Sequence, residues 1–127
     1  MPDRLVLCVD DEAVLLLALR HRLESVLGAG YRIETALSGE SALAALETIR
    51  AGGGEAAAVV SDWRMPGMKG DEVLRAARAS FPRARLMLLT GYADREELLA
   101  LDSELGLAGI LQKPCDMREL AELIRGP

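Results

Sequence analysis

Residues 4–12 read RLVLCVDDE, a short apolar run that ends in three acidic residues. The run Arg4–Val9 is continuous and rich in aliphatic residues, which is typical of a strand covered on both faces of a parallel sheet. From Glu12 to about Leu27, leucines recur at helical spacing until Gly28 ends the predicted helix. A strand followed by an amphipathic helix is a βα unit, and this unit sets the pattern for the rest of the chain.

The same alternation recurs four more times along the sequence. Further strands are predicted at Tyr31–Leu37, Ala57–Ser61, Arg85–Leu89 and Gly109–Leu111. Further helices are predicted after the cap residue Ser38, over Asp71–Ser80, over Asp94–Leu105 and after the cap residue Asp116. Because parallel strands need right-handed crossover connections, these units predict one α/β domain over residues 1–127. The expected fold is a flavodoxin-like, three-layer (βα)5 doubly wound parallel sheet with strand order 2-1-3-4-5.

Composition excludes several classes of protein. The net charge is −5, and four aromatic residues are too few for a base-stacking surface, so we expect no direct nucleic-acid binding. Two cysteines make neither a disulfide framework nor a zinc site, and Cys8 is expected to be buried. No segment resembles a signal peptide or a membrane span, so we expect a cytoplasmic protein with no membrane partner. The arginines around residues 75–85 are expected to form a solvated face.

Polar residues gather where the predicted strands end. Asp10 and Asp11 follow the first strand, Asp62 the third, Thr90 the fourth and Lys113 the fifth. In open parallel sheets, ligands bind outside the carboxyl ends of the strands. Carboxylates brought this close cannot all stay ionised without a cation or shifted pKa values. Oxygen ligands select a hard ion such as Mg²⁺ over zinc, so the sequence predicts a magnesium site.

The other residues at these strand ends suit phosphoryl transfer. Lys113 adds a compact positive charge and Thr90 a hydroxyl donor, and both can neutralise the charge on a transferred phosphoryl group. Asp62 is the predicted nucleophile, because it ends the central strand and precedes a loop rich in glycine and proline. Taken singly, each residue has a plain structural explanation as a helix cap, a turn residue or a solvated lysine. Their joint placement favours the chemical interpretation.

The stretches LVLCVDDE, VVSDWRMPGMKG, LMLLTGYAD and ILQKP occur in this order and cover essentially the whole chain. On these residues the sequence resembles the receiver domains of bacterial two-component response regulators, including the chemotaxis regulators. The resemblance implies that Asp62 is the phospho-acceptor. It also implies that Asp11 binds Mg²⁺ directly, that Asp10 binds it largely through water, and that the backbone carbonyl of Arg64 completes the protein ligands.

The resemblance assigns further roles. Thr90 matches the hydroxyl that bonds the phosphoryl group, and Lys113 matches the lysine that pairs with it. The peptide bond after Lys113 is expected to be cis. Ile110 departs from the family pattern, in which this position is usually Phe or Tyr, and this puts signalling through a rotating aromatic ring in doubt. The side chains of Arg64 and Tyr92 would flank the phosphoryl group, and we hypothesise that they tune its lifetime.

The expected function is therefore a phospho-acceptor switch rather than an enzyme with a separate substrate. A sensor histidine kinase or a phosphotransfer protein would phosphorylate Asp62, and an effector or a second copy would bind the face of helix 94–105, strand 109–111 and the last helix. One alternative is a pseudo-receiver that acts without phosphorylation, and another is a receiver excised from a larger regulator with an output domain. An aspartyl-nucleophile phosphatase is disfavoured, because Arg64 stands where such enzymes commonly carry a second acid.

Overall fold

Five strands alternate with five helices in the computed structural model, which describes residues 4–91 and 95–126. The strands are β1 (Arg4–Val9), β2 (Tyr31–Ala36), β3 (Ala56–Asp62), β4 (Arg85–Thr90) and β5 (Gly109–Gln112). The helices are α1 (Ala13–Leu27), α2 (Gly39–Ala51), α3 (Gly70–Ser80), α4 (Arg95–Leu105) and α5 (Met117–Arg125). The predicted order of elements is confirmed.

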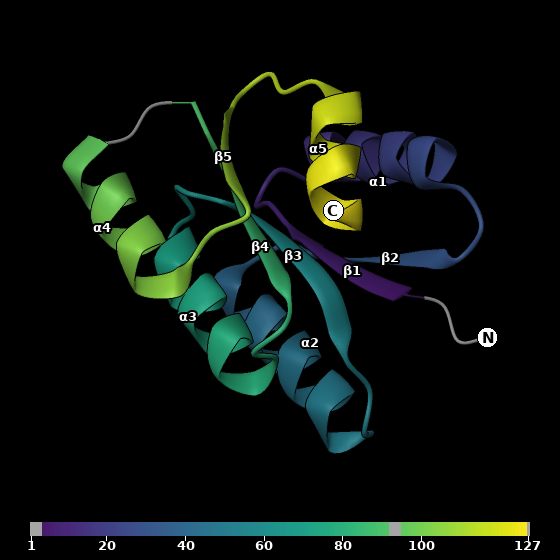
Figure 1. Cartoon of the computed structure of the whole chain (residues 1–127), viewed down its shortest axis with the longest axis horizontal. Helices are drawn as coiled ribbons and strands as arrows, with labels where there is room; N and C mark the ends of the chain where they lie inside the picture. The colour runs from purple at the N-terminus through teal and green to yellow at the C-terminus, as the bar shows by residue number, and fades with distance from the viewer. Residues whose placement is uncertain (1–3, 92–94, 127) are drawn as a thin grey trace.

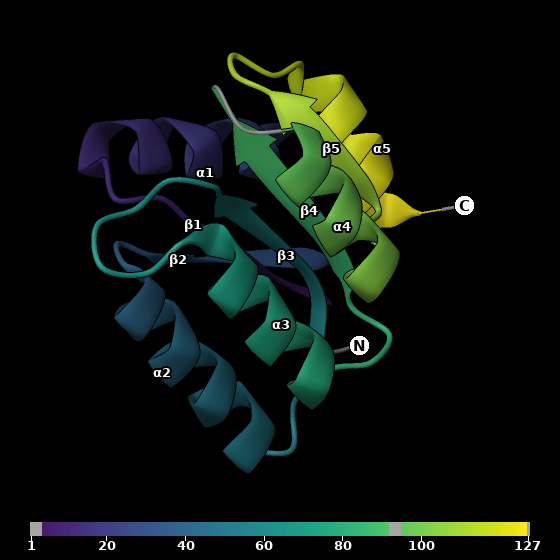
Figure 2. The same ribbon diagram turned by 90° about the vertical axis from the view of Figure 1, so that its left-hand side faces the viewer.

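The strands form one parallel sheet in the order β2-β1-β3-β4-β5, as predicted. Helices α1 and α5 pack on one face of the sheet, and α2, α3 and α4 cover the other, which gives three layers (Figure 1). In Figure 2, turned by 90°, α1 lies on one side of the sheet and α2 and α3 lie on the other. The doubly wound α/β fold is thereby confirmed.

The sheet has a hydrophobic core on each face, and a strand contributes side chains to both, because successive side chains point to opposite faces of a sheet. In β1, Val6 and Cys8 pack toward α1 and α5, whereas Leu7 and Val9 pack toward α2 and α3. These residues are at most 2% exposed, which explains the continuous apolar run in the sequence. The expected burial of Cys8 is confirmed.

Three strands run one residue further than the sequence predicts, β3 to Asp62, β4 to Thr90 and β5 to Gln112. Asp62 and Thr90 were expected just beyond β3 and β4, but each is the last residue of its strand. The reason is pairing with a neighbouring strand, since Asp62 is in register with Leu89 and Thr90 with Gln112. Both functional candidates are therefore held by the sheet itself.

The helix starts follow the cap chemistry in two of the predicted cases. The Ser38 hydroxyl accepts a hydrogen bond from the backbone N–H of Ser41, and the Asp116 carboxylate accepts one from that of Arg118. Helix α3 begins at Gly70, one residue earlier than predicted. Helix α4 is described from Arg95 onward, so its predicted start at Asp94 lies outside the described residues.

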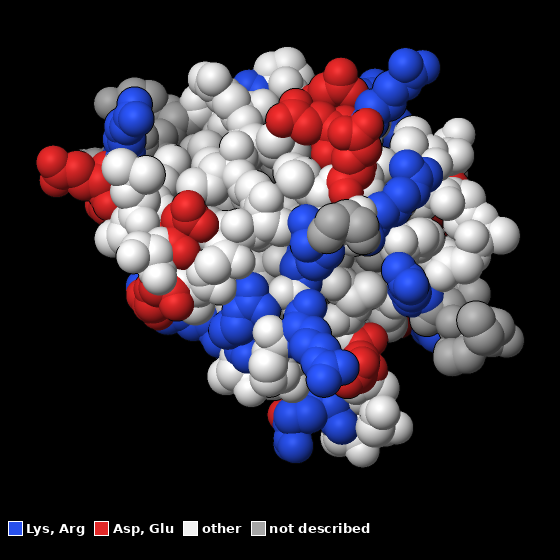
Figure 3. All heavy atoms as spheres, in the orientation of Figure 1, with Lys and Arg blue, Asp and Glu red and all other residues white. Residues whose placement is uncertain are grey.

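Arg78 and Arg85 lie toward the end of the sheet opposite Asp62 and Thr90. The arginines of residues 75–85 were expected to form a solvated face, but these two donate hydrogen bonds to backbone carbonyls, which corrects that expectation. Arg78 donates to the carbonyls of Leu105 and Gly106 at the end of α4, and Arg85 donates to a carbonyl at the end of α5. All five helices end at this edge, where unpaired carbonyls and the negative ends of the helix dipoles favour cations. Figure 3 shows basic side chains gathered where α2 and α3 end.

None of the helices that the structure describes is long and apolar enough to cross a membrane.

Candidate functional site

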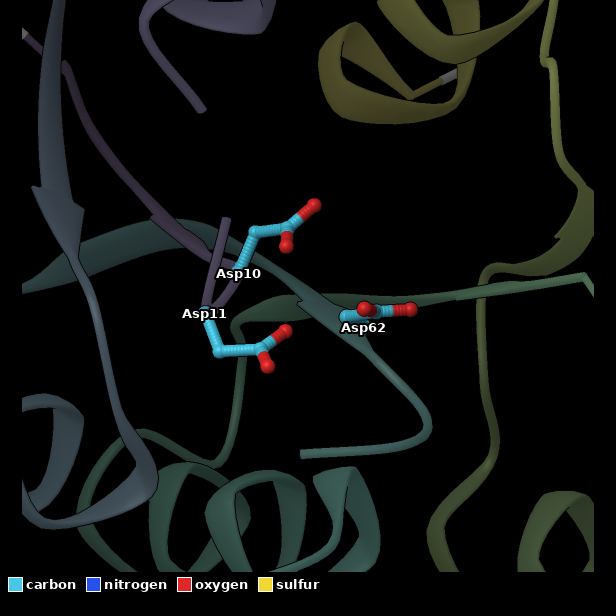
Figure 4. Close-up of side chains that lie close together, drawn as sticks. All are labelled: Asp10, Asp11 and Asp62. Carbon is cyan, nitrogen blue, oxygen red and sulfur yellow. The ribbon is translucent and has the colours of Figure 1, made fainter. Parts of the chain in front are cut away.

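Three carboxylates meet at the carboxyl end of the sheet. Asp10 and Asp11 follow β1 directly, and Asp62 ends the adjacent strand β3 (Figure 4). One oxygen from each carboxylate lies within 4.8 Å of those from the other two. Asp10 and Asp62 are buried, whereas Asp11 is exposed. Sheet order causes this convergence, because β1 and β3 are neighbours although 52 residues of sequence separate Asp10 from Asp62.

Lys113 reaches this cluster from the end of β5. Its Nζ lies 3.0 Å from Oδ1 of Asp62 and 3.3 Å from Oδ2 of Asp10. Asp10 also accepts a hydrogen bond of 2.9 Å from the backbone N–H of Glu12. The peptide bond between Lys113 and Pro114 is cis, as expected. A single lysine charge thus faces two buried carboxylates, with a third carboxylate beside them.

Burial and the neighbouring charges shift the pKa values of the pair in the same direction. Burial raises the pKa of the Asp62 carboxyl, and this outweighs the lowering by Lys113 and by the Trp63 backbone N–H. Burial by itself lowers the pKa of Lys113, but the hydrogen bonds and charges of Asp62 and Asp10 raise it above its usual range. Asp62 therefore carries its negative charge at a cost, and a further cation at the site would relieve that cost.

Thr90 brings an unsatisfied hydroxyl to the same edge. It ends β4, the strand that pairs with β3, and it is 7% exposed. Within the described part of the chain, its Oγ1 has no hydrogen-bond partner. A buried hydroxyl without a partner is costly, so a group that binds here can supply a hydrogen bond that the described residues do not.

The structure also describes two of the other residues that the sequence predicts to matter, Arg64 and Ile110. Arg64 is exposed two residues beyond Asp62. Ile110 is half-buried and packs against the core between the sheet and the helices α2, α3 and α4. Tyr92 lies outside the described residues, so its predicted place beside the site stays a prediction.

Of two further residues with a direct part in the site geometry, the sequence indicates Gly70, through the glycine-rich loop after Asp62, but not Ser61. The hydroxyl of Ser61 donates to the backbone carbonyl of Asp62, and Gly70 packs directly against that same carbonyl. The glycine that ends the loop after Asp62 is a weak sequence signal for close backbone approach. Ser61 carries no such signal, because an isolated serine in an apolar strand is common.

Comparison with known proteins places this geometry in a family. The family model described as the response regulator receiver domain matches residues 6–125. The chain is 33% identical over 120 residues to the sensor kinase CckA of Brucella abortus, and 32% identical over 120 residues to the hydrogenase transcriptional regulatory protein HoxA of Cupriavidus necator. Each match covers 94% of this chain, but the chain spans only 12% and 23% of the length of those two relatives.

Solved structures agree with the sequence matches. A CheY-like response regulator receiver domain protein from Methanospirillum hungatei superposes with a TM-score of 0.82 at 27% identity, covering 98% of this chain and 92% of the other. The fold, the strand order and the match over residues 6–125 all point the same way. The chain belongs to the response regulator receiver domains of two-component systems.

Proposed function

We propose that this receiver domain accepts a phosphoryl group on Asp62 in a magnesium-dependent reaction. The observation that carries the proposal is the buried hydroxyl of Thr90, which has no partner in the described chain and stands beside a carboxylate cluster that faces one lysine. A phosphoryl group on Asp62 supplies oxygens that can accept from this hydroxyl and from Lys113. The cluster and its two donors thus form the two sides of one phosphoryl site.

The chemistry of the donor set fits Mg²⁺. Carboxylate oxygens from Asp10, Asp11 and Asp62, with the backbone carbonyl of Arg64, are hard ligands of the kind that Mg²⁺ takes. The charge balance also fits, since Lys113 by itself faces two buried carboxylates. When bound, the ion would supply positive charge next to the phosphoryl oxygens.

The side chains of the site have separate roles in the transfer. Among the described residues, Lys113 and the Trp63 backbone N–H hold the Asp62 carboxylate, and both contacts fall on Oδ1 at 3.0 Å. We therefore assign the attack to Oδ2. A bond forms from Oδ2 to phosphorus, the bond from phosphorus to the donor's histidine nitrogen breaks, and the electron pair of that bond leaves on the imidazole. Lys113 and Thr90 then bond the phosphoryl oxygens.

The proposed partners follow from this reaction. A sensor histidine kinase or a phosphotransfer protein is the phosphodonor, and the protein catalyses only its own phosphorylation and slow dephosphorylation. Phosphorylation turns the singly charged Asp62 carboxylate into an acyl phosphate with close to two negative charges, which draws Thr90 and Lys113 toward the phosphoryl group. This change biases the surface formed by α4, β5 and α5, which binds an effector or a second copy. Ile110 stands on β5 in place of the usual ring, so we assign the motion to Thr90 and α4.

Intact mass spectrometry tests the proposal directly. The protein is incubated with acetyl phosphate and Mg²⁺, and the expected result is one added phosphate on the wild type. The Asp62→Asn variant and the wild type in EDTA should gain none. Asp116→Asn is the matched control, because asparagine also caps α5 and the residue is exposed, so this variant should be phosphorylated like the wild type.

Only one of the two alternatives predicts a different result in this assay. A pseudo-receiver gains no phosphate, and neither beryllofluoride nor Mg²⁺ changes the fluorescence of Trp63, which is buried next to Asp62. A receiver that belongs to a larger regulator is phosphorylated as proposed, and its output lies in the rest of that protein.

A further inference from the structure

One peptide unit connects the buried interior to the carboxylate of Asp62. It is the peptide between Asp62 and Trp63, whose N–H end lies 3.0 Å from Oδ1 of Asp62 and 2.9 Å from the carbonyl of Leu89 on β4. Its C=O end accepts a hydrogen bond of 2.9 Å from the hydroxyl of Ser61, which is fully buried. The N–H end of this unit therefore faces the Asp62 carboxylate, and the C=O end faces the buried interior.

The C=O end is also confined by the first residue of α3. A Cβ atom placed on Gly70 would lie 2.3 Å from the Asp62 carbonyl oxygen and 3.1 Å from Oγ of Ser61. The first of these distances is far shorter than real Cβ contacts, so any residue larger than glycine at position 70 would displace the Asp62 carbonyl. The backbone N–H of Gly70 in turn donates to the carbonyl of Trp63 at 2.9 Å, which closes the loop between β3 and α3.

A peptide unit is planar and stiff, so it transmits a tilt from one end to the other. If its carbonyl loses the Ser61 hydroxyl, the unit can rotate about the flanking single bonds. The N–H then moves relative to Oδ1, and the Asp62 carboxylate loses one of the two contacts that orient it. A displacement of about 1 Å at a reacting group can cost roughly 100-fold in rate.

We propose that Ser61 is a positioning residue for phosphoryl transfer: together with Gly70 it holds the peptide unit after Asp62 and thereby aims the attacking oxygen of that carboxylate. This inference rests on the proposed function of Asp62. It goes beyond it by naming the residue that sets the geometry of attack. Ser61 acts through the backbone and touches neither the phosphodonor nor the ligands contributed by β1.

The test compares three substitutions at Ser61. Ser61→Ala removes the hydroxyl, Ser61→Cys keeps the size but offers only a weak donor, and Ser61→Thr keeps the hydroxyl on a residue suited to a strand. The rate constant of phosphorylation by acetyl phosphate is measured by intact mass at saturating Mg²⁺. The dissociation constant for Mg²⁺ is measured separately by the fluorescence of Trp63.

We expect the rate of phosphorylation to fall much further than the affinity for Mg²⁺. The Ala and Cys variants should be phosphorylated roughly 10- to 100-fold more slowly than the wild type, a range set by the sensitivity of such reactions to displacement. Their affinity for Mg²⁺ should fall by a clearly smaller factor than the rate, because Asp10 and Asp11, two of the three carboxylates in the proposed ligand set, follow another strand, β1. Ser61→Thr should restore the rate. Gly70→Ala pushes the same carbonyl from the other side, and where it folds it should also slow phosphorylation.

Other outcomes would overturn the inference. A Ser61→Ala variant that unfolds more easily but is phosphorylated at the wild-type rate shows a purely structural serine. Equal slowing by Ala and Thr shows that the hydroxyl is irrelevant, and a loss of Mg²⁺ affinity as large as the loss in rate shows an effect on the metal ligands instead. A wild type that gains no phosphate overturns the proposed function as well as this inference, so the two failures are distinct.

Discussion

Replacing Lys113 with methionine should destabilise the protein in a way that Mg²⁺ reverses. The Lys113 ammonium lies 3.0 Å from Asp62 and 3.3 Å from Asp10, whose side chains are only 12% and 6% exposed. Methionine keeps the length of the side chain and removes its charge. The two carboxylates then face each other without the lysine charge, so the folded state without Mg²⁺ loses most of its local charge balance.

The size of the effect follows from the geometry. Two unit charges about 3 Å apart attract by roughly 5 kcal/mol at an effective dielectric constant near 20, before the cost of desolvation is subtracted. Removing one partner of a fully buried pair costs about 3–5 kcal/mol. Because the Lys113 side chain is 28% exposed, we expect a smaller loss of about 2–3 kcal/mol in the free energy of unfolding.

Urea denaturation in EDTA and again in millimolar Mg²⁺ measures this loss. The ion should stabilise the Lys113→Met variant more than the wild type, because it supplies the positive charge that the variant lacks. Lys69→Met is the matched control. Its ammonium is 59% exposed and lies 4.0 Å from Glu97, so its removal should cost less than about 1 kcal/mol.

Two results would refute the reasoning. A Lys113→Met variant as stable as the wild type in EDTA would mean that the carboxylates of Asp10 and Asp62 do not depend on this lysine. Equal stabilisation of both proteins by Mg²⁺ would mean that the ion and the lysine act at separate places.

Three further predictions concern Asp62, the two cysteines and Arg78. Burial raises the pKa of Asp62 above its ordinary 3.8, so the folded protein binds this proton more tightly than the unfolded chain. Without Mg²⁺ the free energy of unfolding should therefore fall as the pH rises through that pKa. In urea denaturation between pH 3 and 7, Asp62→Asn should remove the part of this fall that Asp62 causes. Burial raises the pKa of the Cys8 thiol to about 12, so a disulfide reagent at pH 8 should modify Cys115 first and Cys8 only on unfolding; early modification of Cys8 would contradict its burial. Arg78→Ala leaves carbonyls at the end of α4 and in the turn before β4 without their charged donor. This should lower the free energy of unfolding, measured in urea, by about 1.5–3 kcal/mol. Arg83 is exposed in the same turn, so Arg83→Ala should change it by less than about 0.5 kcal/mol.

The sequence by itself determined the order of the elements and the edge of the sheet that carries the chemistry. Apolar runs and helical periodicity are local patterns, so the run Arg4–Val9 and the leucines after it identify a strand and a helix without any knowledge of the rest. Parallel strands bring their carboxyl ends to one edge, which is why Asp10, Asp62 and Lys113 could be grouped before the fold was known.

Only the tertiary structure decided how those residues are held. The contact between Lys113 and Asp10 joins residues 103 apart in the chain, and its length depends on sheet register and on the packing of α5. The close approach of Gly70 to the Asp62 carbonyl depends on how α3 packs against β3. Sequence patterns carry no record of such contacts, because hydrogen bonds and close packing are set by distances between residues that the chain alone does not bring together.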